Sequence, residues 1–320
     1  MLRFATLFVC GKFVLCYNEF MKKVIWILVA LIVVFSSTYV VWREIEKRKD
    51  NESSQDDIVL RVSSDVGVWW WHKADADKYL RFAKQNGIDE IYYCDYDMNE
   101  QTSEFVLKAK EKGIKVYALW GEYQWIFDRD EFDEMMIKYQ NYQQTHQNAM
   151  FEGVHLDVEP HQVKDDEQTS DVNESFSENR NEYLTKYVEF VYYATNTYQS
   201  VMFDFDIPFW IDDAITFKGE TKECFKHVID MAGRVFVMSY RDTAEKIVYV
   251  ANEELEYAKT KNKKIALSVE MTSSEGDQVS FEEESKKQLC KEFEKVECLI
   301  DQEILFSVHH IETWFGLKEE

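Results

Sequence analysis

The feature that most constrains the fold of this chain is a regular alternation of short β-rich runs with longer amphipathic segments. Eight runs have the composition of buried strands, and they cover residues 66–71, 90–97, 115–122, 153–160, 203–210, 234–240, 264–271 and 304–314. Helical segments lie between most of them, at residues 74–88, 103–114, 130–144, 181–199, 244–261 and 282–296. Such alternation is typical of parallel strands joined by helical crossovers. The sequence therefore predicts a parallel sheet whose strands are separated by helices.

The number of units favours a closed barrel over an open doubly wound sheet. Eight units over about 250 residues match the size of a (β/α)₈ barrel. An open sheet that binds a dinucleotide carries a glycine-rich phosphate loop after its first strand, whereas residues 67–75 read GVWWWHKAD. Six residues follow Trp314, so the last unit has a very short helix or none. We predict an α/β fold, a (β/α)₈ TIM barrel over residues 65–320.

An uncharged segment precedes the predicted barrel. Residues 24–42 run for 19 positions without a charge, which is enough to cross a bilayer as a helix. Because Lys22 and Lys23 precede this run, the stretch that starts at Met21 resembles a signal anchor. We predict one transmembrane helix that contacts the lipid bilayer, although a cleaved secretion signal is the alternative. The predicted divisions are an upstream extension (1–20), the anchor (21–45), a linker (46–64) and the barrel; a start at Met1 or at Met21 stays open.

The orientation of the anchor depends on two opposing signals. Four basic residues, Arg43, Lys47, Arg48 and Lys49, come after the apolar run, and this count alone favours a cytoplasmic C-terminus. Long C-terminal domains are translocated largely regardless of flanking charge, and a short basic start usually directs the downstream domain outward. We therefore expect a single-pass protein of the cell membrane with an extracellular C-terminal domain.

Charge and cysteine content exclude several classes of partner. Acidic residues outnumber basic ones by 60 to 37, giving a net charge of -23, which works against binding nucleic acid or another polyanion. Beyond the anchor lie Cys94, Cys224, Cys290 and Cys298, with no CxxC pair and no histidine at the spacing of a zinc finger. We predict free or singly paired thiols, no metal site and no cofactor.

The ends of the predicted strands carry the candidate functional residues, because a barrel of this kind places its chemistry at the C-terminal ends of its strands. The candidates for catalysis are Asp157, Glu159, Tyr240 and Glu270. The candidates for binding a substrate are Trp70, Asp95, Trp120, His155, Trp210, Arg241, His309 and Trp314. Aromatic rings at such a rim are suited to stacking on sugars, although one or more of three consecutive tryptophans must face the helices. The pair at 309–310 points in opposite directions on a strand, which favours packing or hydrogen bonding over metal ligation.

The stretch FEGVHLDVEPH, residues 151–161, concentrates ionisable groups on one strand. Side chains two apart on a strand point to the same side, so Asp157 and Glu159 should share a face with His155. Burial and like charge raise the pKa of a carboxyl group, and one member of such a pair can stay protonated as a general acid. An internal ion pair, for example between Asp157 and Arg241, is the structural alternative.

FEGVHLDVEP resembles the fourth-strand signature of family 18 glycoside hydrolases, the chitinases and their relatives, which reads Asp-Gly-x-Asp-x-Asp-x-Glu. Gly153, Asp157 and Glu159 match this signature. Glu152 stands at its first Asp, and His155 replaces its middle Asp. The resemblance implies that Glu159 is a general acid and that Asp157 positions an N-acetyl group of the substrate, which attacks its own anomeric carbon.

Two further elements resemble the same family. VMSYRD, residues 237–242, is similar to its sixth-strand Met-x-Tyr-Asp element, in which Met238 and Tyr240 match and Arg241 stands where Asp is usual. Trp314 comes after the eighth strand, where that family keeps a tryptophan under the reactive sugar. This implies that Tyr240 hydrogen-bonds the N-acetyl group.

A second group of glycosidases offers an alternative role for Glu270. The VEP sequence followed by this residue also resembles retaining barrel glycosidases, whose acid lies on strand four and whose nucleophilic Glu lies on strand seven. Val158 replaces the Asn that normally precedes the acid. A separation of about 5 to 5.5 Å between Glu159 and Glu270 would fit that double displacement. Both interpretations assign the acid to Glu159.

The sequence as a whole predicts a membrane-anchored glycoside hydrolase-like protein that acts on an extracellular glycan. A catalytically inactive carbohydrate-binding protein is one alternative, which the replacement at His155 makes plausible. A structural or regulatory membrane protein, whose acidic rim contacts another protein, is another. Residues 162–181 form a polar insertion directly after Pro160, and we expect it to cover the cleft.

Overall fold

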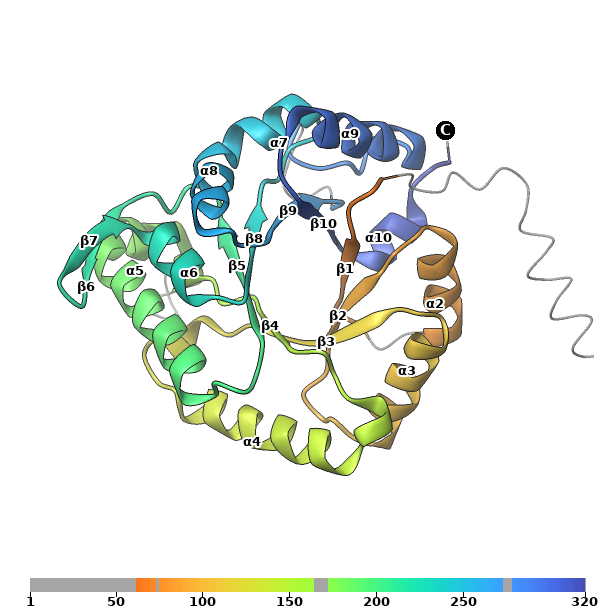
Figure 1. Ribbon diagram of the computed structural model, residues 1–320, viewed down its shortest axis with the longest axis horizontal. Coiled ribbons are helices and arrows are strands. Elements are labelled where there is room, and N and C mark those ends of the chain that lie inside the picture. Colours follow the sequence, from red (N-terminus) through yellow and green to blue (C-terminus); the bar gives the residue numbers. More distant parts are fainter. Residues whose placement is uncertain (1–61, 73–74, 164–171, 273–277, 320) are drawn as a thin grey trace, which may run out of the picture. The chain divides into compact units, whose positions relative to one another are not determined.

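The computed structural model describes residues 62–72, 75–163, 172–272 and 278–319. Within them, eight parallel strands close into a barrel in the order β1-β10-β9-β8-β5-β4-β3-β2, with helices around its outside (Figure 1). The strands are β1 Val66–Trp70, β2 Glu90–Cys94, β3 Lys115–Trp120, β4 Val154–Leu156, β5 Phe203–Pro208, β8 Arg234–Met238, β9 Ile265–Glu270 and β10 Ile304–His309. The predicted (β/α)₈ barrel is confirmed.

The helices alternate with the strands as expected. They are α2 Ala76–Gln85, α3 Glu100–Glu111, α4 Asp130–Thr145, α5 Val172–Thr197, α6 Cys224–Met231, α7 Ala244–Val250, α8 Asn252–Lys261, α9 Lys286–Leu299 and α10 Ile311–Gly316. Three short 3₁₀ helices are η1 Tyr123–Ile126, η2 Gln147–Ala149 and η3 Pro160–Gln162. Local sequence explains several starts; for example, Asn99 accepts hydrogen bonds from the backbone of Gln101 and Thr102 and completes a capping box at α3. The last helix has six residues, and the sequence predicted a very short helix or none at this place.

Three elements differ from the prediction. A hairpin of β6 (Ala214–Phe217) and β7 (Glu220–Glu223) lies between β5 and α6, and neither it nor α6 was predicted. Its two turn residues, Lys218 and Gly219, have positive φ values of 50° and 84°, as the common two-residue hairpin turn requires. The eighth strand ends at His309 instead of residue 314, because α10 begins directly after it.

The three consecutive tryptophans face different sides of β1. Trp69 lies inside the barrel, with its ring centroid 5.3 Å from that of Tyr92. Trp70 faces the helix layer, where its ring lies 5.0 Å from that of Phe105 on α3. Trp71 comes directly after the strand, at the C-terminal rim. This alternation is the one that strand geometry predicts.

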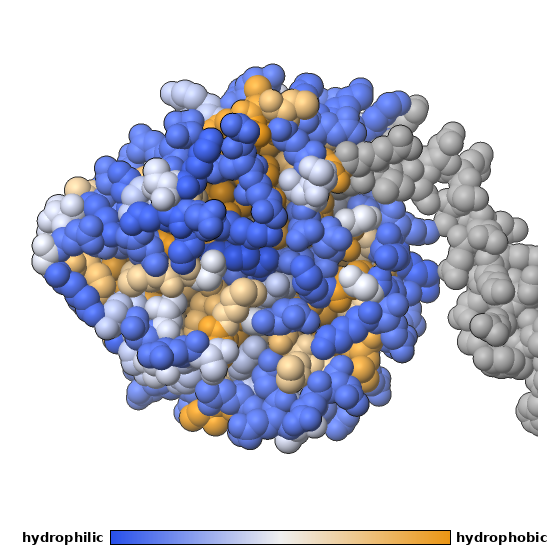
Figure 2. Space-filling model, in the orientation of Figure 1, coloured by the Kyte–Doolittle hydropathy of each residue, from blue (hydrophilic) through white to orange (hydrophobic). Residues whose placement is uncertain are grey.

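The predicted anchor, residues 24–42, lies outside the described residues, as does most of the segment before the barrel. Among the helices that the structure describes, none is long and apolar enough to cross a membrane. Figure 2 shows that hydrophilic residues dominate the face of the barrel in view. The excess of acids over bases is consistent with this surface.

Candidate active site

A cavity of about 700 Å³ lies at the C-terminal rim of the barrel. Its walls come from the strand ends, as the fold predicts for a functional site. Of the residues singled out in the sequence, seven line it: Asp157, Glu159, Trp210, Tyr240, Arg241, Glu270 and His309. Acidic, aromatic and basic side chains that are far apart in the chain therefore meet in one hollow.

The chain beyond β4 is held tightly against the end of β3. The backbone N–H of Asp157 donates to the carbonyl of Trp120 over 2.8 Å. Gly121 is the next residue, and a Cβ at this position would stand 1.9 Å from the carbonyl oxygen of Asp157. A side chain at residue 121 would therefore force the backbone of Asp157 away from its present place.

Glu159 lines the cavity two residues beyond Asp157 and is partly exposed, at 18% of its side chain. The side-chain amide of Gln162 donates to one of its oxygens, and His161 Nε2 lies 3.5 Å from the other. Burial, and then the charge of Arg180, lower the pKa of His161 to about 4. Because His161 is neutral at neutral pH, both of these contacts to the Glu159 carboxyl come from uncharged groups.

Asp157 is a half-buried carboxyl of the cavity, and its Oδ1 is shielded from solvent. Its Oδ1 has no hydrogen-bond partner among the described residues. Burial, followed by the charge of Asp206 on β5, raises the pKa of Asp157 to about 7. A substantial fraction of this carboxyl is therefore protonated at neutral pH, and it can donate a hydrogen bond.

His155 does not line the cavity, contrary to its predicted role in contacting substrate, but lies in the barrel interior. Its Nε2 is 2.6 Å from Asp206 Oδ2, and its Nδ1 is 3.9 Å from Asp204 Oδ2. Its ring stacks on Tyr92 at 4.2 Å. Burial alone would lower the pKa of His155, but the charge of Asp206 and the contacts to both aspartates outweigh it and raise the pKa to about 9. The side chain is therefore an imidazolium at neutral pH.

Glu270, His309 and Trp71 form a hydrogen-bonded chain across one wall. Glu270 Oε1 accepts from the N–H groups of Met271 and Thr272 over 2.6 and 2.8 Å, and its Oε2 lies 2.7 Å from His309 Nδ1. Burial opposes ionisation of Glu270, but the hydrogen bond and charge of His309 prevail and lower its pKa. The indole N–H of Trp71 donates to His309 Nε2 over 2.7 Å.

The Trp71 contact fixes the tautomer of His309. Nε2 can accept a hydrogen bond only if it carries no proton, so the single ring proton lies on Nδ1 and points to Glu270. Burial disfavours the imidazolium of His309, whereas Glu270 favours it and raises its pKa overall. The hydrogen bond from Trp71 requires a neutral His309 ring, whereas the carboxylate of Glu270 favours the protonated ring. The two contacts therefore have opposite effects on the charge of His309.

Tyr240 contributes a hydroxyl that stays protonated. Burial, and then the charges of Glu270 and Asp157, raise its pKa well above the usual value for tyrosine. The neighbouring Arg241 donates to the carbonyl of Tyr240 over 2.6 Å, and its guanidinium lies 4.9 Å from the ring of Phe209. The ion pair between Asp157 and Arg241, which was the structural alternative, does not occur in the described part of the chain.

Four predicted contact residues lie away from the cavity, in the packing between the barrel and its helices. Trp70 and Trp314 are 1% exposed, and Trp314 packs its ring at 5.7 Å from Phe82. The indole N–H of Trp120 donates to the carbonyl of Asp95 over 3.0 Å, and the carboxylate of Asp95 accepts from the backbone of Asp97. Position at a strand end was a poor guide for these residues, because their side chains point outward or back into the core.

Several cavity residues did not enter the predicted site. Those with a polar or aromatic side chain are Trp71, Glu122, Tyr123, His161, Gln162 and Phe209. Most lie one to three residues beyond a strand, in loops whose path the strand pattern does not specify. Asp206 lies beneath the cavity. The sequence shows it as an acid near the end of β5, but its proximity to Asp157 depends on the register between β4 and β5.

The described residues form neither a metal-binding cluster nor a disulfide bond. No group of three or more His, Cys, Asp or Glu side chains there is arranged to hold a metal ion. Cys94, Cys224, Cys290 and Cys298 form no disulfide bond within the described residues.

Comparison with known protein families returns one match. The model of tRNA synthetases class I (M) matches residues 63–191, which is less than half of the 320 residues. In the structure this stretch forms β1 to β4 of the closed barrel and reaches into α5. No curated protein matches the chain.

Solved structures match at low identity. A putative chitinase A from Streptomyces coelicolor is 10% identical with a TM-score of 0.46, over 79% of this chain and 93% of that one. The spore cortex-lytic enzyme SleL from Bacillus cereus is 12% identical with a TM-score of 0.39, over 64% of this chain and 51%, about half, of that one. A putative deoxyribose-phosphate aldolase from Toxoplasma gondii is 11% identical with a TM-score of 0.45, over 85% and 94%.

Glycoside hydrolases recur among these distant matches. The matched proteins also include the aldolase, so the similarity describes the barrel and leaves the reaction to be argued from the site. The chain is similar to glycoside hydrolase barrels in its fold.

Proposed function

We propose that this protein is a glycoside hydrolase with Glu159 as its general acid, acting on an extracellular glycan. The observation that carries the proposal is the meeting of Glu159, Asp157 and Tyr240 in one cavity at the rim. Two contacts of the Glu159 carboxyl come from the uncharged side chains of Gln162 and His161, which stabilise its ionised form less than a cation in the same place would. A carboxyl in such a setting is suited to protonating a glycosidic oxygen.

The surroundings of Glu270 favour an orienting role over that of a nucleophile. Both of its oxygens accept hydrogen bonds from the chain itself, and its side chain is only 3% exposed. A nucleophile must instead present an oxygen to the anomeric carbon. This supports attack by an acetamido group of the substrate, held by the protonated Asp157 and the hydroxyl of Tyr240. The proposed substrate is therefore a glycan that contains N-acetylated sugars.

Aromatic side chains supply the remaining surface for a sugar. Trp71, Tyr123, Phe209 and Trp210 line the same cavity as the carboxyl groups. Flat rings of this kind stack on the apolar faces of pyranoses. Polar groups for catalysis and apolar walls for binding are thus present side by side.

A reducing-end assay of the full-length chain on a panel of N-acetylated glycans tests this function. We expect Glu159→Gln to lower turnover by about 10²- to 10⁴-fold, because it keeps the shape and removes the acid. The matched control is Glu182→Gln, an exposed position on α5 that forms a 3.7 Å ion pair with Lys186. Equal activity in Glu159→Gln and the parent would contradict the assignment of the acid. Absence of any product, together with glycan binding, would favour the inactive binding protein.

The role of Glu270 has its own test. Substrate assistance predicts that added azide does not rescue Glu270→Ala, since no covalent enzyme intermediate forms at this residue. Rescue by azide, with a glycosyl azide as product, would instead identify Glu270 as the nucleophile.

We also propose that residues 24–42 anchor the chain in the cell membrane with the barrel outside. The uncharged run and the preceding lysines support this orientation. Cys298 is exposed on the barrel, whereas Cys224 and Cys290 are buried. A membrane-impermeant maleimide should therefore label Cys298 on intact cells, and Cys298→Ser should remove that label. Labelling only after lysis would contradict the outward orientation.

A further inference from the structure

A column of charged side chains runs through the barrel beneath Asp157. Strands β4 and β5 pair in parallel, with His155 opposite Asp204 and Leu156 opposite Phe205. The next residues along, Asp157 directly after β4 and Asp206 on β5, therefore lie at about the same level, and neighbouring strands are about 4.8 Å apart. Because side chains alternate along a strand, all four ionisable residues face the barrel interior.

The hydrogen bonds in this column leave two oxygens without a donor. His155 Nε2 lies 2.6 Å from Asp206 Oδ2, which accounts for one oxygen of that carboxylate. Asp206 Oδ1 and Asp157 Oδ1 are both buried, and neither has a hydrogen-bond partner among the described residues. Two adjacent carboxyl groups with free acceptor oxygens are satisfied when one proton lies between them.

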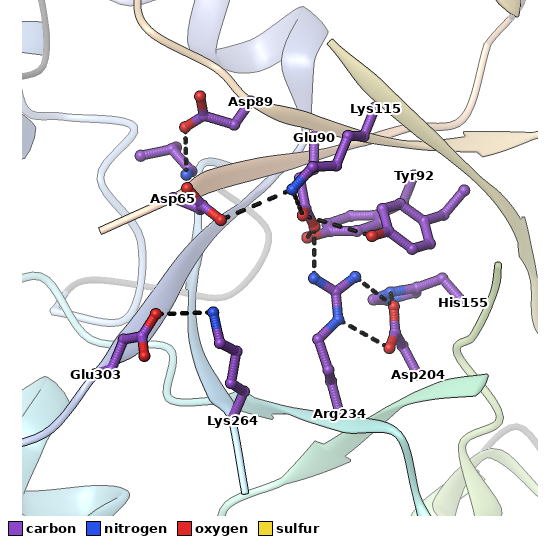
Figure 3. A network of polar contacts seen from close by, with 12 residues as sticks. Asp65, Asp89, Glu90, Tyr92, Lys115, His155, Asp204, Arg234, Lys264 and Glu303 are labelled. Atoms are coloured by element: carbon purple, nitrogen blue, oxygen red, sulfur yellow. Dashed lines mark hydrogen bonds and ion pairs between the residues drawn. The ribbon is translucent and has the colours of Figure 1, made fainter. Parts of the chain in front are cut away.

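The lower end of the column is neutralised from the opposite rim. Arg234 on β8 donates to both oxygens of Asp204, over 3.0 and 2.6 Å, and to Glu90 on β2 over 2.8 Å (Figure 3). Asp204 is thus paired with a guanidinium, and it approaches His155 from below at 3.9 Å (Figure 3). The imidazolium of His155 therefore lies between two carboxylates, of which only Asp206 is next to Asp157.

We propose that Asp206 and His155 are positioning residues that hold a proton on Asp157: the imidazolium keeps Asp206 ionised, and this neighbouring carboxylate keeps the proton on the Asp157 carboxyl. No covalent bond changes in this arrangement. The single proton is shared between the two aspartates, and Asp157 is its main carrier. How the proton is used, as a hydrogen bond that orients the substrate, rests on the proposed function; the arrangement itself does not.

The other ionisable groups around Asp157 are compatible with this assignment. They are Glu159 beyond β4, Tyr240 beyond β8, Glu270 on β9, His309 on β10 and Tyr187 on α5. The hydroxyl of Tyr187 donates its hydrogen bond to the carbonyl of Asp206 over 3.0 Å. The ring proton of His309 points to Glu270. Neither of these two side chains supplies the missing donor to Asp157.

The arrangement also accounts for the histidine in the β4 motif. An acid at position 155 would have been the charged neighbour of Asp157 on its own strand. Here the histidine occupies that place, and the carboxylate comes from the adjacent strand as Asp206. Asp157 therefore still has a carboxylate beside it, but this carboxylate comes from the neighbouring strand and not from its own.

An infrared titration of carboxyl groups in the full-length chain, reconstituted in lipid vesicles, tests the proposal without relying on catalysis. In the parent, a carboxyl band that Asp157→Asn removes should titrate near pH 7. In Asp206→Asn, its midpoint should fall by about one pH unit or more, because the neighbouring negative charge is gone. The matched control is Asp204→Asn, the same change two residues earlier on β5, which should move the midpoint much less.

His155→Gln is a second variant, which should shift the titration midpoint of Asp157 in the opposite direction. It removes the positive charge, so both aspartates become harder to ionise and the midpoint should rise. This variant decides the question even if circular dichroism shows that Asp206→Asn does not fold. Equal shifts in Asp206→Asn and Asp204→Asn, or an unchanged midpoint in His155→Gln, would overturn the proposal.

Activity supplies an independent readout. On a glycan that the chain hydrolyses, the pH profile of kcat/KM should shift in the same direction as the infrared midpoint in each variant. If no glycan is hydrolysed while the titration behaves as expected, the proposed function fails and the assignment of the proton stands. If hydrolysis occurs and no variant moves the Asp157 midpoint, the proposed function stands and the assignment of the proton fails.

Discussion

At the scale of single residues, the molecule is defined by ionisable groups whose environments are unlike water. Asp157 is a carboxyl whose raised pKa keeps it partly protonated near neutral pH, and His155 is a buried imidazole whose raised pKa keeps it charged. Burial alone pushes both groups toward their neutral forms. Their different outcomes are due to their neighbours, since Asp157 adjoins a carboxylate and His155 lies between two of them.

The hydrogen bond from Trp71 should depress the pKa of His309. In Trp71→Phe the donor is lost, Nε2 is free to take a proton, and the pKa of His309 should rise. Histidine ¹⁵N NMR of the full-length chain measures this pKa directly. Trp210→Phe is the control, because this second cavity tryptophan contacts His161 instead, with ring centroids 5.1 Å apart. An unchanged His309 titration in Trp71→Phe would show that the indole does not set the tautomer.

His155 should make the stability of the barrel depend on pH. Its pKa is raised in the folded state, from 6.5 to about 9, so its contribution is complete below pH 6.5 and is lost as the pH rises through 9. The loss over this window should be roughly 3 kcal/mol. Urea unfolding at a series of pH values measures it. His155→Gln should lack this part of the decline, and an identical decline in parent and variant would refute the assignment.

At the scale of elements, the chain segments that follow the neighbouring strands β3 and β4 pack closely against each other. Gly121 comes directly after β3 and Asp157 directly after β4, and the two backbones are too close for a Cβ on residue 121. The backbone N–H of Asp157 donates to the carbonyl of Trp120, the last residue of β3, over 2.8 Å. The position of Asp157 thus depends on a small residue that follows the neighbouring strand.

Gly121→Ala should disturb the site more than its small size implies. The new methyl group would displace the backbone of Asp157, and we expect a loss of activity together with a destabilisation of about 1 to 3 kcal/mol. Turnover and urea unfolding measure the two effects. Gly316→Ala is the control, because nothing lies within 4 Å of a Cβ at that position. Equal effects at both glycines would argue against the close approach.

Helix α5, which includes the end of the predicted insertion, supports one wall of the cavity. Arg180 on α5 donates to Asp213 over 2.5 Å and to the carbonyl of Trp210 over 2.6 Å, and it lies 4.9 Å from the ring of Trp210. Residues 162–163 are described, and helix α5 includes the end of the predicted insertion, residues 172–181. Residues 164–171 lie outside the described part, so covering of the cleft by the insertion stays a prediction.

Arg180→Ala should weaken substrate binding more than chemistry. Trp210 would lose its support, so KM should rise while kcat changes little, because this wall holds the sugar and not the reacting atoms. Steady-state kinetics on the best glycan separate the two constants. Arg129→Ala is the control, since Arg129 stacks on Tyr193 at 4.6 Å and does not line the cavity. A fall in kcat at constant KM would place Arg180 in the chemistry instead.

At the scale of the whole molecule, the barrel is tied across its interior by ionic contacts. Arg234 joins β8 to Asp204 on β5 and to Glu90 on β2, and its guanidinium lies 4.6 Å from the ring of Tyr117. These strands are not all neighbours in the sheet. One side chain therefore links distant parts of the wall.

Arg234→Met should be strongly destabilising. It removes the guanidinium that pairs with the buried carboxylates of Asp204 and Glu90, and leaves Lys115 as the lysine partner of Glu90. Breaking a buried ion pair by removing one partner typically costs about 3 to 5 kcal/mol. The free energy of unfolding in urea measures the loss. Lys264→Met is the control, because the 2.8 Å pair between Lys264 and Glu303 is exposed and should contribute no more than about 1 kcal/mol. A similar loss in both variants would contradict a special role for the buried ion pairs.

The fold was largely predictable because its signals are local. Each strand is a short β-rich run, and the helices between them show amphipathic spacing and clear starts, so the barrel could be predicted by counting units. The hairpin β6–β7 was missed, because its strands have only four residues each and β7, with the sequence ETKE, is wholly polar. Its turn contains a single glycine after a lysine, which is a weak signal in the sequence.

The sequence by itself determined the barrel and the strand end that carries Asp157 and Glu159, since alternation and spacing are properties of neighbouring residues. Only the tertiary structure decided which side chains meet them. It brought Asp206 beside Asp157 and joined Trp71, His309 and Glu270. It also turned Trp70, Trp120 and Trp314 into the core. The physical reason is that contacts between strands depend on register and on long-range packing, and neither is encoded in the local pattern of one strand.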